Sequence, residues 1–241
     1  LPSVGAGNVL SDILQSDVVP SVRLTDIFRQ DESSMIVLNA HRINHGEMPV
    51  LKTRDTDFFF ERRALPSEAA QDICDLLQKR LPGYLGFPRE RWQAEAARAI
   101  QVLSPTKKGD CGSISLNRRL QEALNPDSRH APSLAHGETI FRQGDKVIQT
   151  KNDYQLEFVR RTALGEETGK GVFNGDVGYI EYVDPSEHLM TVLFDDDRRV
   201  TYEKQQLDAL ELAYAVTVHK SQGSEFPVVV MPVVSGPPML M

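Results

Sequence analysis

The polar residues from Thr217 to Glu225 have the types and spacing of a ligand-binding turn. They follow an apolar segment, 213–218, whose composition is typical of a buried strand. His219 and Glu225 can donate or accept hydrogen bonds, and Gly223 allows a tight turn. Parallel sheets bind ligands at the carboxyl ends of their strands, so this segment is a candidate binding site. A plain surface β-turn is the alternative.

A second polar segment begins at Ser104, directly after a strand predicted over 99–103. Ser104 and Thr106 supply hydroxyl groups, and Lys107 and Lys108 supply two adjacent positive charges. Together these groups suit a phosphodiester backbone, which DNA-binding proteins hold through such contacts. The alternative is that the lysine pair belongs to an ordinary solvated surface.

The distribution of charge favours the same part of the chain as a host for a polyanion. The net charge of −7 over 241 residues argues against a protein that wraps nucleic acid with its whole surface. Residues 89–130, however, contain eight Lys and Arg against five Asp and Glu, a net charge of +3. Residues 145–204 contain eight against thirteen, a net charge of −5. A polyanion is therefore expected to bind the first stretch rather than the second.

The composition is that of an ordinary globular protein, with 40% hydrophobic and 25% charged residues. The longest apolar run, 226–234, contains two prolines and is too short to span a membrane, so no membrane partner is expected. Cys74 and Cys111 are too few for a disulfide framework or a zinc site. We therefore expect two reduced thiols, no metal site in this stretch and a cytoplasmic location.

The pattern of hydrophobic residues predicts an α/β chain interrupted by a small β-rich insert. Residues 1–141 alternate between helices and strands, which favours a parallel sheet. Residues 142–208 consist of short β-type pieces separated by turns and are typical of a small antiparallel barrel. Residues 209–241 return to buried strands. Helices are predicted over 8–14, 33–44, 67–81, 92–99 and 116–124, and strands over 22–24, 58–60, 99–103, 213–218 and 227–231.

Three strings resemble conserved motifs of superfamily-one DNA helicases, and in particular of the RecD-like branch. Residues 215–226, AVTVHKSQGSEF, resemble the fifth motif. The opening, LPSVGAGNVL over residues 1–10, is similar to the end of the third motif. LTDIFRQ over residues 24–30, followed by IVLNAHRIN over residues 36–44, is similar to the fourth motif. The resemblance covers nearly the whole chain.

The resemblance to the fifth motif implies a role for each of its polar residues. In that family the threonine and histidine face the DNA strand, whereas the glycine and glutamate approach the nucleotide. The residues implied to contact DNA are Thr217, His219 and Lys220, and those implied to contact ATP are Gln222, Gly223 and Glu225.

The resemblance to the fourth motif points to Arg29 as the catalytic residue. In the family an arginine at this place crosses the domain cleft to the γ-phosphate of ATP. A permanently charged, planar guanidinium suits that contact. Phe28 is implied to pack beside the nucleotide, with a place in the hydrophobic core as its alternative.

The basic segment and the β-rich insert also have counterparts in RecD-like helicases. A Ser-Pro-x-(Lys/Arg) run followed by an Asn-x-x-Leu-Gln helix is similar to 104–108 and 117–121 here. DNA contacts are thereby implied for Ser104, Thr106, Lys107, Lys108 and Asn117. Residues 144–154 and 172–178 resemble an SH3-like barrel inserted in the second motor domain. Between them, 155–171 is longer and more charged than expected, and we predict a mobile loop.

The family resemblance thus implies a RecA-like second motor domain with an inserted SH3-like barrel, from an ATP-dependent 5′-to-3′ DNA helicase of repair or recombination. The implied partners are single-stranded DNA, the N-terminal motor domain of the same chain and a protein bound to the barrel. ATP with Mg²⁺ is the implied cofactor. No Gly-x-x-x-x-Gly-Lys-(Ser/Thr) loop, acidic magnesium box or sixth motif is seen in the 241 residues, so this stretch is expected to be inactive alone and to lack the magnesium ligands. The alternative is a non-catalytic DNA- or protein-binding module of a recombination nuclease, similar to the alpha subunit of exodeoxyribonuclease V.

Overall fold

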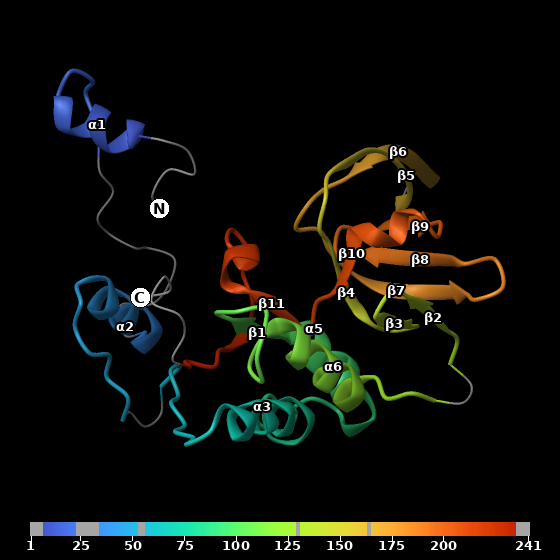
Figure 1. Ribbon diagram of the computed structural model, residues 1–241, viewed down its shortest axis with the longest axis horizontal. Helices are drawn as coiled ribbons and strands as arrows, with labels where there is room; N and C mark the ends of the chain where they lie inside the picture. The colour runs from blue at the N-terminus through green and yellow to red at the C-terminus, as the bar shows by residue number, and fades with distance from the viewer. Residues whose placement is uncertain (1–6, 23–33, 53–55, 129–130, 163–164, 235–241) are drawn as a thin grey trace. The chain divides into compact units, whose positions relative to one another are not determined.

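The computed structural model describes residues 7–22, 34–52, 56–128, 131–162 and 165–234 (Figure 1). The chain divides into two compact units, 1–62 and 63–241. Arg29 and Phe28 lie outside the described residues, as does most of the strand predicted over 22–24. No helix in the described ranges is long and apolar enough to cross a membrane.

The described residues of the first unit form helices α1 (Val9–Ser16) and α2 (Met35–Asn44), in agreement with the sequence prediction. Ser34 caps α2, because its hydroxyl accepts a hydrogen bond from the amide of Val37 at 3.3 Å. The strand predicted over 58–60 is wrong: these residues form no strand, and Phe59 and Phe60 are exposed. No other strand is described in this unit to pair with them, and an unpaired strand is not stable.

The second unit begins with a series of short helices and helical turns, and α6 follows later in the chain. These are α3 (Pro66–Asp75), the π-helical turn η1 (Leu76–Arg80), α4 (Leu81–Tyr84), the 3-10 turn η2 (Arg89–Arg91), α5 (Trp92–Ala99) and α6 (Ser113–Leu124). The prediction that Pro82 stops the first helix is wrong. The amide of Leu81 donates to the carbonyl of Leu76, five residues back, and Pro82 then takes the first turn of α4, where its missing N–H costs nothing.

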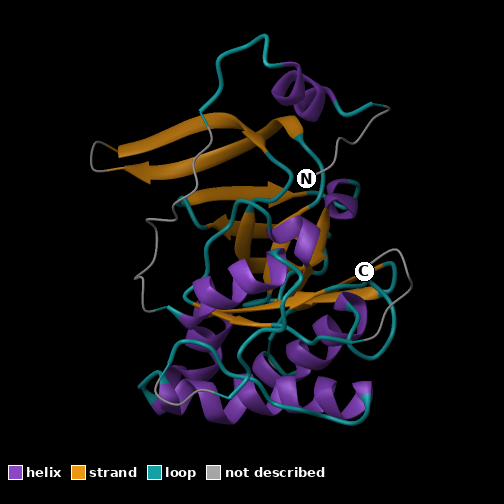
Figure 2. Cartoon of the chain, turned by 90° about the vertical axis from the view of Figure 1, so that its left-hand side faces the viewer, coloured by secondary structure: helices purple, strands orange, loops and turns teal. Residues whose placement is uncertain are grey.

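A small parallel sheet packs with these helices. It consists of β1 (Ile100–Ser104), β11 (Ala215–Thr217) and β12 (Val228–Val230), with β1 in the centre. The register pairs Val102 with Ala215 on one side and Ile100 with Val228 on the other. Ile100 and Val102 are buried in one core with Leu116 and Leu120 of α6. Figure 2 separates this helical layer from the strands by colour.

The rest of the second unit is mainly an antiparallel sheet. In space its strands follow the order β10-β4-β7-β8-β9-β5-β6, and β2 (Ser133–His136) pairs separately with β3 (Thr139–Arg142). The sheet strands are β4 (Lys146–Gln149), β5 (Asp153–Thr162), β6 (Gly165–Val172), β7 (Val177–Asp184), β8 (Leu189–Phe194), β9 (Arg198–Tyr202) and β10 (Leu210–Leu212). A 3-10 turn, η3 (Gln206–Ala209), precedes β10.

The structure confirms a parallel sheet together with an antiparallel one, but not a closed barrel. Strands β10 and β6 are the two edges, and within the described ranges no hydrogen-bonded pairing joins them. The sheet ends at Leu212, slightly beyond the segment 142–208 assigned to the insert. The boundaries at 141/142 and 208/209 remain predictions.

The prediction of a mobile loop over 155–171 is wrong, because residues 155–162 belong to β5 and residues 165–171 to β6, and the two strands pair. Their charges are cross-strand partners: Arg161 lies opposite Glu166 and Glu157 opposite Lys170, with nitrogen-to-oxygen distances of 3.6 and 3.1 Å. Opposite charges on facing strand positions stabilise the pairing. The charges that suggested a solvated loop are therefore paired across two strands, and because both pairs are exposed each adds only a little stability.

A buried carboxylate joins the helical part of the second unit to the antiparallel sheet. Asp145 is 0% exposed and accepts hydrogen bonds from the side chains of Gln121 (2.6 Å), Asn125 (2.8 Å) and Tyr214 (2.9 Å) and from the amide of Arg142 (2.7 Å). Burial raises the pKa of Asp145 and outweighs these hydrogen bonds, which lower it. The network ties α6 and the chain entering β11 to the start of β4.

Candidate functional site

The two polar segments singled out in the sequence meet at one edge of the parallel sheet. Strands β1 and β11 are parallel neighbours, and Ser104 at the end of one pairs with Thr217 at the end of the other. The loop 105–112 follows β1, and the 3-10 turn η4 (Val218–Ser221) follows β11. Both segments therefore leave the sheet at its carboxyl edge, where α/β proteins bind ligands.

The loop after β1 is shaped by the hydroxyl of Ser104. This residue is 0% exposed, and its Oγ lies 2.7 Å from the carbonyl oxygens of both Thr106 and Cys111. Its hydroxyl is turned into the loop and is engaged by the loop's own backbone. Thr106 is also engaged, with its Oγ1 donating to the carbonyl of Lys108 at 3.0 Å. A side chain at Gly112 would meet that same carbonyl oxygen at 2.5 Å, so the loop requires glycine there.

The loop after β11 presents a mixture of exposed and engaged residues. Thr217 is half-buried and His219 is exposed. Lys220 Nζ lies 2.7 Å from a carboxylate oxygen of Glu211 in β10, so this lysine is held against the antiparallel sheet. Gly223 has φ 84°, and nothing lies within 4 Å of the place where a side chain would begin. The turn can therefore be approached closely from outside.

The far end of the same loop rests on a buried lysine. Lys146 in β4 is 2% exposed, and its ammonium lies 5.9 Å from the centre of the Phe226 ring. Burial lowers the pKa of Lys146 to about 8, against the opposing charge of Asp195. Since β4 and β10 are neighbours in the antiparallel sheet, one edge of that sheet braces both ends of the loop.

Asn117 serves the same loop from the side of α6. Its Nδ2 donates to the carbonyls of Leu212 and Ala215, both at 2.9 Å, and its Oδ1 accepts from the amide of Ala215 at 2.8 Å. The amide is occupied by the backbone that enters β11. These bonds hold the backbone that enters β11 against α6, a contact that the sequence alone did not indicate.

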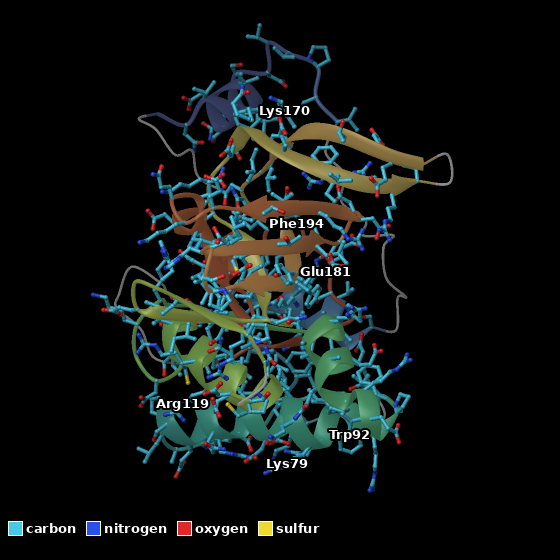
Figure 3. All side chains as sticks on the ribbon, turned by 90° about the vertical axis from the view of Figure 1, so that its right-hand side faces the viewer. Lys79, Trp92, Arg119, Lys170, Glu181 and Phe194 are labelled. Atoms are coloured by element: carbon cyan, nitrogen blue, oxygen red, sulfur yellow. The ribbon has the colours of Figure 1, made fainter. Side chains whose placement is uncertain are left out.

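A basic cavity of about 430 Å³ lies between the first loop and α6. Its walls carry the charges of Lys107, Lys108, Arg118 and Arg119. The lysines were expected from the sequence, whereas the arginines were not singled out. The available signal was the helical spacing of Ile114, Ser115, Arg118 and Arg119, which places them on one face of α6 beside the loop. Figure 3 labels Arg119 on this helix, and Lys170, Glu181 and Phe194 on the antiparallel sheet.

The residues implied to contact a nucleotide lie on the surface of the second loop. Gln222, Gly223 and Glu225 are all exposed. They can contact a nucleotide from one side but bring no free cation for its phosphates. No group of three or more His, Cys, Asp or Glu side chains able to hold a metal ion occurs in the described part of the chain.

Two family models match this sequence. The model described as the SH3 domain of ATP-dependent RecD-like DNA helicases matches residues 116–194. The model described as the UvrD-like helicase C-terminal domain matches residues 212–241. The first match covers most of α6 and the strands from β2 to β8, and the second includes the loop after β11.

Individual relatives agree with these matches. The ATP-dependent RecD2 DNA helicase of Deinococcus radiodurans is 32% identical over 226 residues, which is 94% of this chain and 26% of that protein. An uncharacterized protein of Methanocaldococcus jannaschii is 32% identical over 57% of this chain and 12% of its own length. The conjugal transfer protein TraA of Agrobacterium fabrum is 33% identical over 39% of this chain and 8% of its own length. The chain thus spans about a quarter of the first relative.

Proposed function

Because the chain belongs to the family of RecD-like DNA helicases, we propose that it is the C-terminal motor portion of an ATP-dependent helicase. In this proposal it binds single-stranded DNA, supplies part of an ATP site and does not turn over ATP alone. The full-length protein moves 5′ to 3′ and acts in DNA repair or recombination. In this proposal, ATP hydrolysis also requires an N-terminal motor domain of the same chain.

The observation that carries the proposal is the parallel pairing of Ser104 with Thr217. This register sets the lysine loop beside His219 at one edge of the sheet, where both can reach a single phosphate backbone. We assign the strand contacts to Lys107, Lys108, Thr217 and His219. Ser104, Thr106, Asn117 and Lys220 are assigned to positioning, because their polar atoms are already engaged.

The same loop offers a nucleotide only part of its site. Gly223 leaves open space for close approach, and the neighbouring Gln222 and Glu225 can hydrogen bond to a base or ribose. Phosphate contacts are assigned to Arg29, with Phe28 beside the nucleotide, on the family resemblance. When bound, ATP supplies the free energy of its hydrolysis. This chain's residues orient the nucleotide and couple the loop to the DNA strand.

The main test compares two histidines in the full-length protein. His219→Asn is expected to lower DNA-stimulated ATP hydrolysis at least tenfold. The reason is that His219 is assigned a contact with the DNA strand and lies in the same loop as the residues assigned to the nucleotide. His188→Asn, at an exposed turn after β7, is the matched control and is expected to behave as the parent. Equal activity of the two variants would contradict the assignment of His219.

The role of Arg29 has its own test. Arg29→Ala in the full-length protein is expected to abolish DNA-stimulated ATP hydrolysis while nucleotide binding stays nearly unchanged. Normal turnover in this variant would refute the role. Unwinding of duplexes with a single 5′ or 3′ overhang tests direction, and only the 5′ overhang is expected to support it.

An exposed aromatic pair favours a second candidate, a non-catalytic binding module. Tyr154 and Phe173 lie edge to face, 5.6 Å between ring centres, and both are exposed. Such a pair on the antiparallel sheet suits a protein partner. A full-length protein that binds DNA without any DNA-stimulated ATP hydrolysis would favour this module, similar to a recombination nuclease subunit, over the motor.

A further inference from the structure

The cavity between the loop after β1 and α6 has two walls of the same sign. Ser115 and Arg119 stand four residues apart on α6, as do Ile114 and Arg118, so all of them share one helix face. The opposite wall is the loop of Lys107, Lys108 and Gly109. Four cationic residues therefore line a space of about 430 Å³.

The charges of this cavity are largely unopposed. Within the described part of the chain, Lys107, Lys108 and Arg119 form no ion pair and no side-chain hydrogen bond. Arg118 has one partner, Glu138 at 3.2 Å, whose side chain is 92% exposed, so the pair is weak. Asp110 lies in the same loop. The thiols of Cys74 and Cys111 are close enough to feel Arg119, but burial raises the pKa of both and keeps them neutral.

Side chains, rather than the backbone amides at the start of α6, supply the hydrogen-bond donors of this cavity. The amides of Ser113 and Ile114 already donate to the carbonyls of Thr106 and Lys107, at 3.0 and 3.2 Å. They are not available to a ligand. The lining side chains offer the ammonium and guanidinium groups and the hydroxyl of Ser115 as donors.

The chemistry of the walls selects the class of ligand. Arginine forks and lysine ammonium groups bind phosphate oxygens. No aromatic side chain lines the cavity, so it offers no platform on which a base could stack. A phosphate with its sugar fits the volume, and the contact carries no sequence preference.

We propose that this cavity holds one backbone phosphodiester of the bound DNA strand, as an anchor beside the sheet edge. This rests on the proposed function, namely that the protein binds single-stranded DNA. The strand then runs from Thr217 and His219 past the lysine loop to the arginine face of α6.

The test measures how single-strand affinity depends on salt in the full-length protein. In Arg118→Gln/Arg119→Gln, the slope of log affinity against log salt is expected to become shallower by about 0.7, the value for one lost phosphate contact on a single strand. Affinity near 0.1 M salt is expected to fall about fivefold. Lys107→Gln/Lys108→Gln removes the opposite, exposed wall and is expected to give the same change, which guards against a folding defect in α6.

The matched control is Arg91→Gln/Lys204→Gln, which removes two exposed cations outside the cavity. Its slope is expected to equal that of the parent, and ATP affinity is expected to be unchanged in all variants. Parent-like slopes in both cavity variants, with normal binding by the parent, would overturn the anchor alone. Loss of ATP affinity with unchanged DNA affinity would also overturn it, in favour of a nucleotide phosphate. A parent protein that binds no single strand would overturn the proposed function and the anchor together.

Discussion

The helical part of the second unit and its antiparallel sheet differ in whether their charged side chains are paired. In the antiparallel sheet most arginines are paired: Arg198 binds Asp176 at 2.7 Å and also Asp196, and Arg199 binds Glu181 at 2.9 Å. At the edge of the parallel sheet, Lys107, Lys108 and Arg119 have no such partner in the described residues. A charged side chain that is paired within the molecule stabilises the fold, whereas an unpaired one is available to bind a charged ligand. Arginine and lysine residues can thus belong either to structural ion pairs or to a binding site, and their number alone does not distinguish the two.

The largest effect is expected where the two regions join. Asp145→Ala leaves the donors of Gln121, Asn125 and Tyr214 buried without their acceptor, which costs about 4 kcal/mol of unfolding free energy. Chemical denaturation measures this. Asp127→Ala, at an exposed position, is the control and is expected to change little. A loss below about 1 kcal/mol would show that the regions do not depend on this carboxylate.

A second variant asks whether the paired charges are structural only. Arg198→Met removes a nearly buried guanidinium and leaves Asp176 without its partner, so we expect a loss of about 3 kcal/mol in unfolding free energy. The salt slope of single-strand binding is expected to stay as in the parent. Arg161→Gln breaks only an exposed pair and serves as the control. A shallower slope in Arg198→Met would erase the contrast between the two regions.

The buried lysine beneath the loop gives a pH dependence. Burial lowers the folded-state pKa of Lys146 from 10.5 to about 8, so between these values the unfolded chain binds more protons. The unfolding free energy contributed by this group therefore rises with pH, by about 2 kcal/mol from pH 8 to pH 10. Lys146→Met is expected to lack this rise. Parallel stability curves for parent and variant over that range would contradict it.

The smallest effect concerns the other end of the brace. Lys220 and Glu211 are partly exposed, so a double-mutant cycle with Lys220→Met and Glu211→Gln is expected to give a coupling of about 0.5 kcal/mol. Neither variant is expected to change the salt slope of DNA binding. A shallower slope in Lys220→Met would instead make Lys220 a strand contact, as the family resemblance implied.

The sequence was most informative where strands are apolar and end in polar turns. The segments around Ser104 and Thr217 were recognised in this way, and so was the parallel type of sheet. The strands of the β5–β6 hairpin were missed because their charged residues stabilise one another only across the ladder, as Arg161 and Glu166 do. Local hydrophobic periodicity does not contain that pairing.

The sequence indicated the two polar segments that meet at the sheet edge, but not what their side chains contact. Ser104, Asn117 and Lys220 have the side chains of ligand-binding residues, yet each one bonds to a group that the chain brings close only on folding. Asn117 reaches Leu212, which is 95 residues away. Arg118 and Arg119 were not predicted as site residues, because they line a cavity only together with the loop that folds beside their helix. The proposed roles of these residues therefore rest on tertiary contacts rather than on residue type.

The open edge at β6 bears on how the chain meets copies of itself. An unpaired strand edge is a template on which another strand can add, and the outer side of β6 has no partner strand in the described ranges. This strand contains Glu166, Glu167 and Lys170 together with three glycines, at 165, 169 and 171. Charge and weak strand propensity both oppose growth of a ladder. We therefore expect the sheet to remain open without recruiting a neighbour, so that a barrel is not needed to protect it from aggregation.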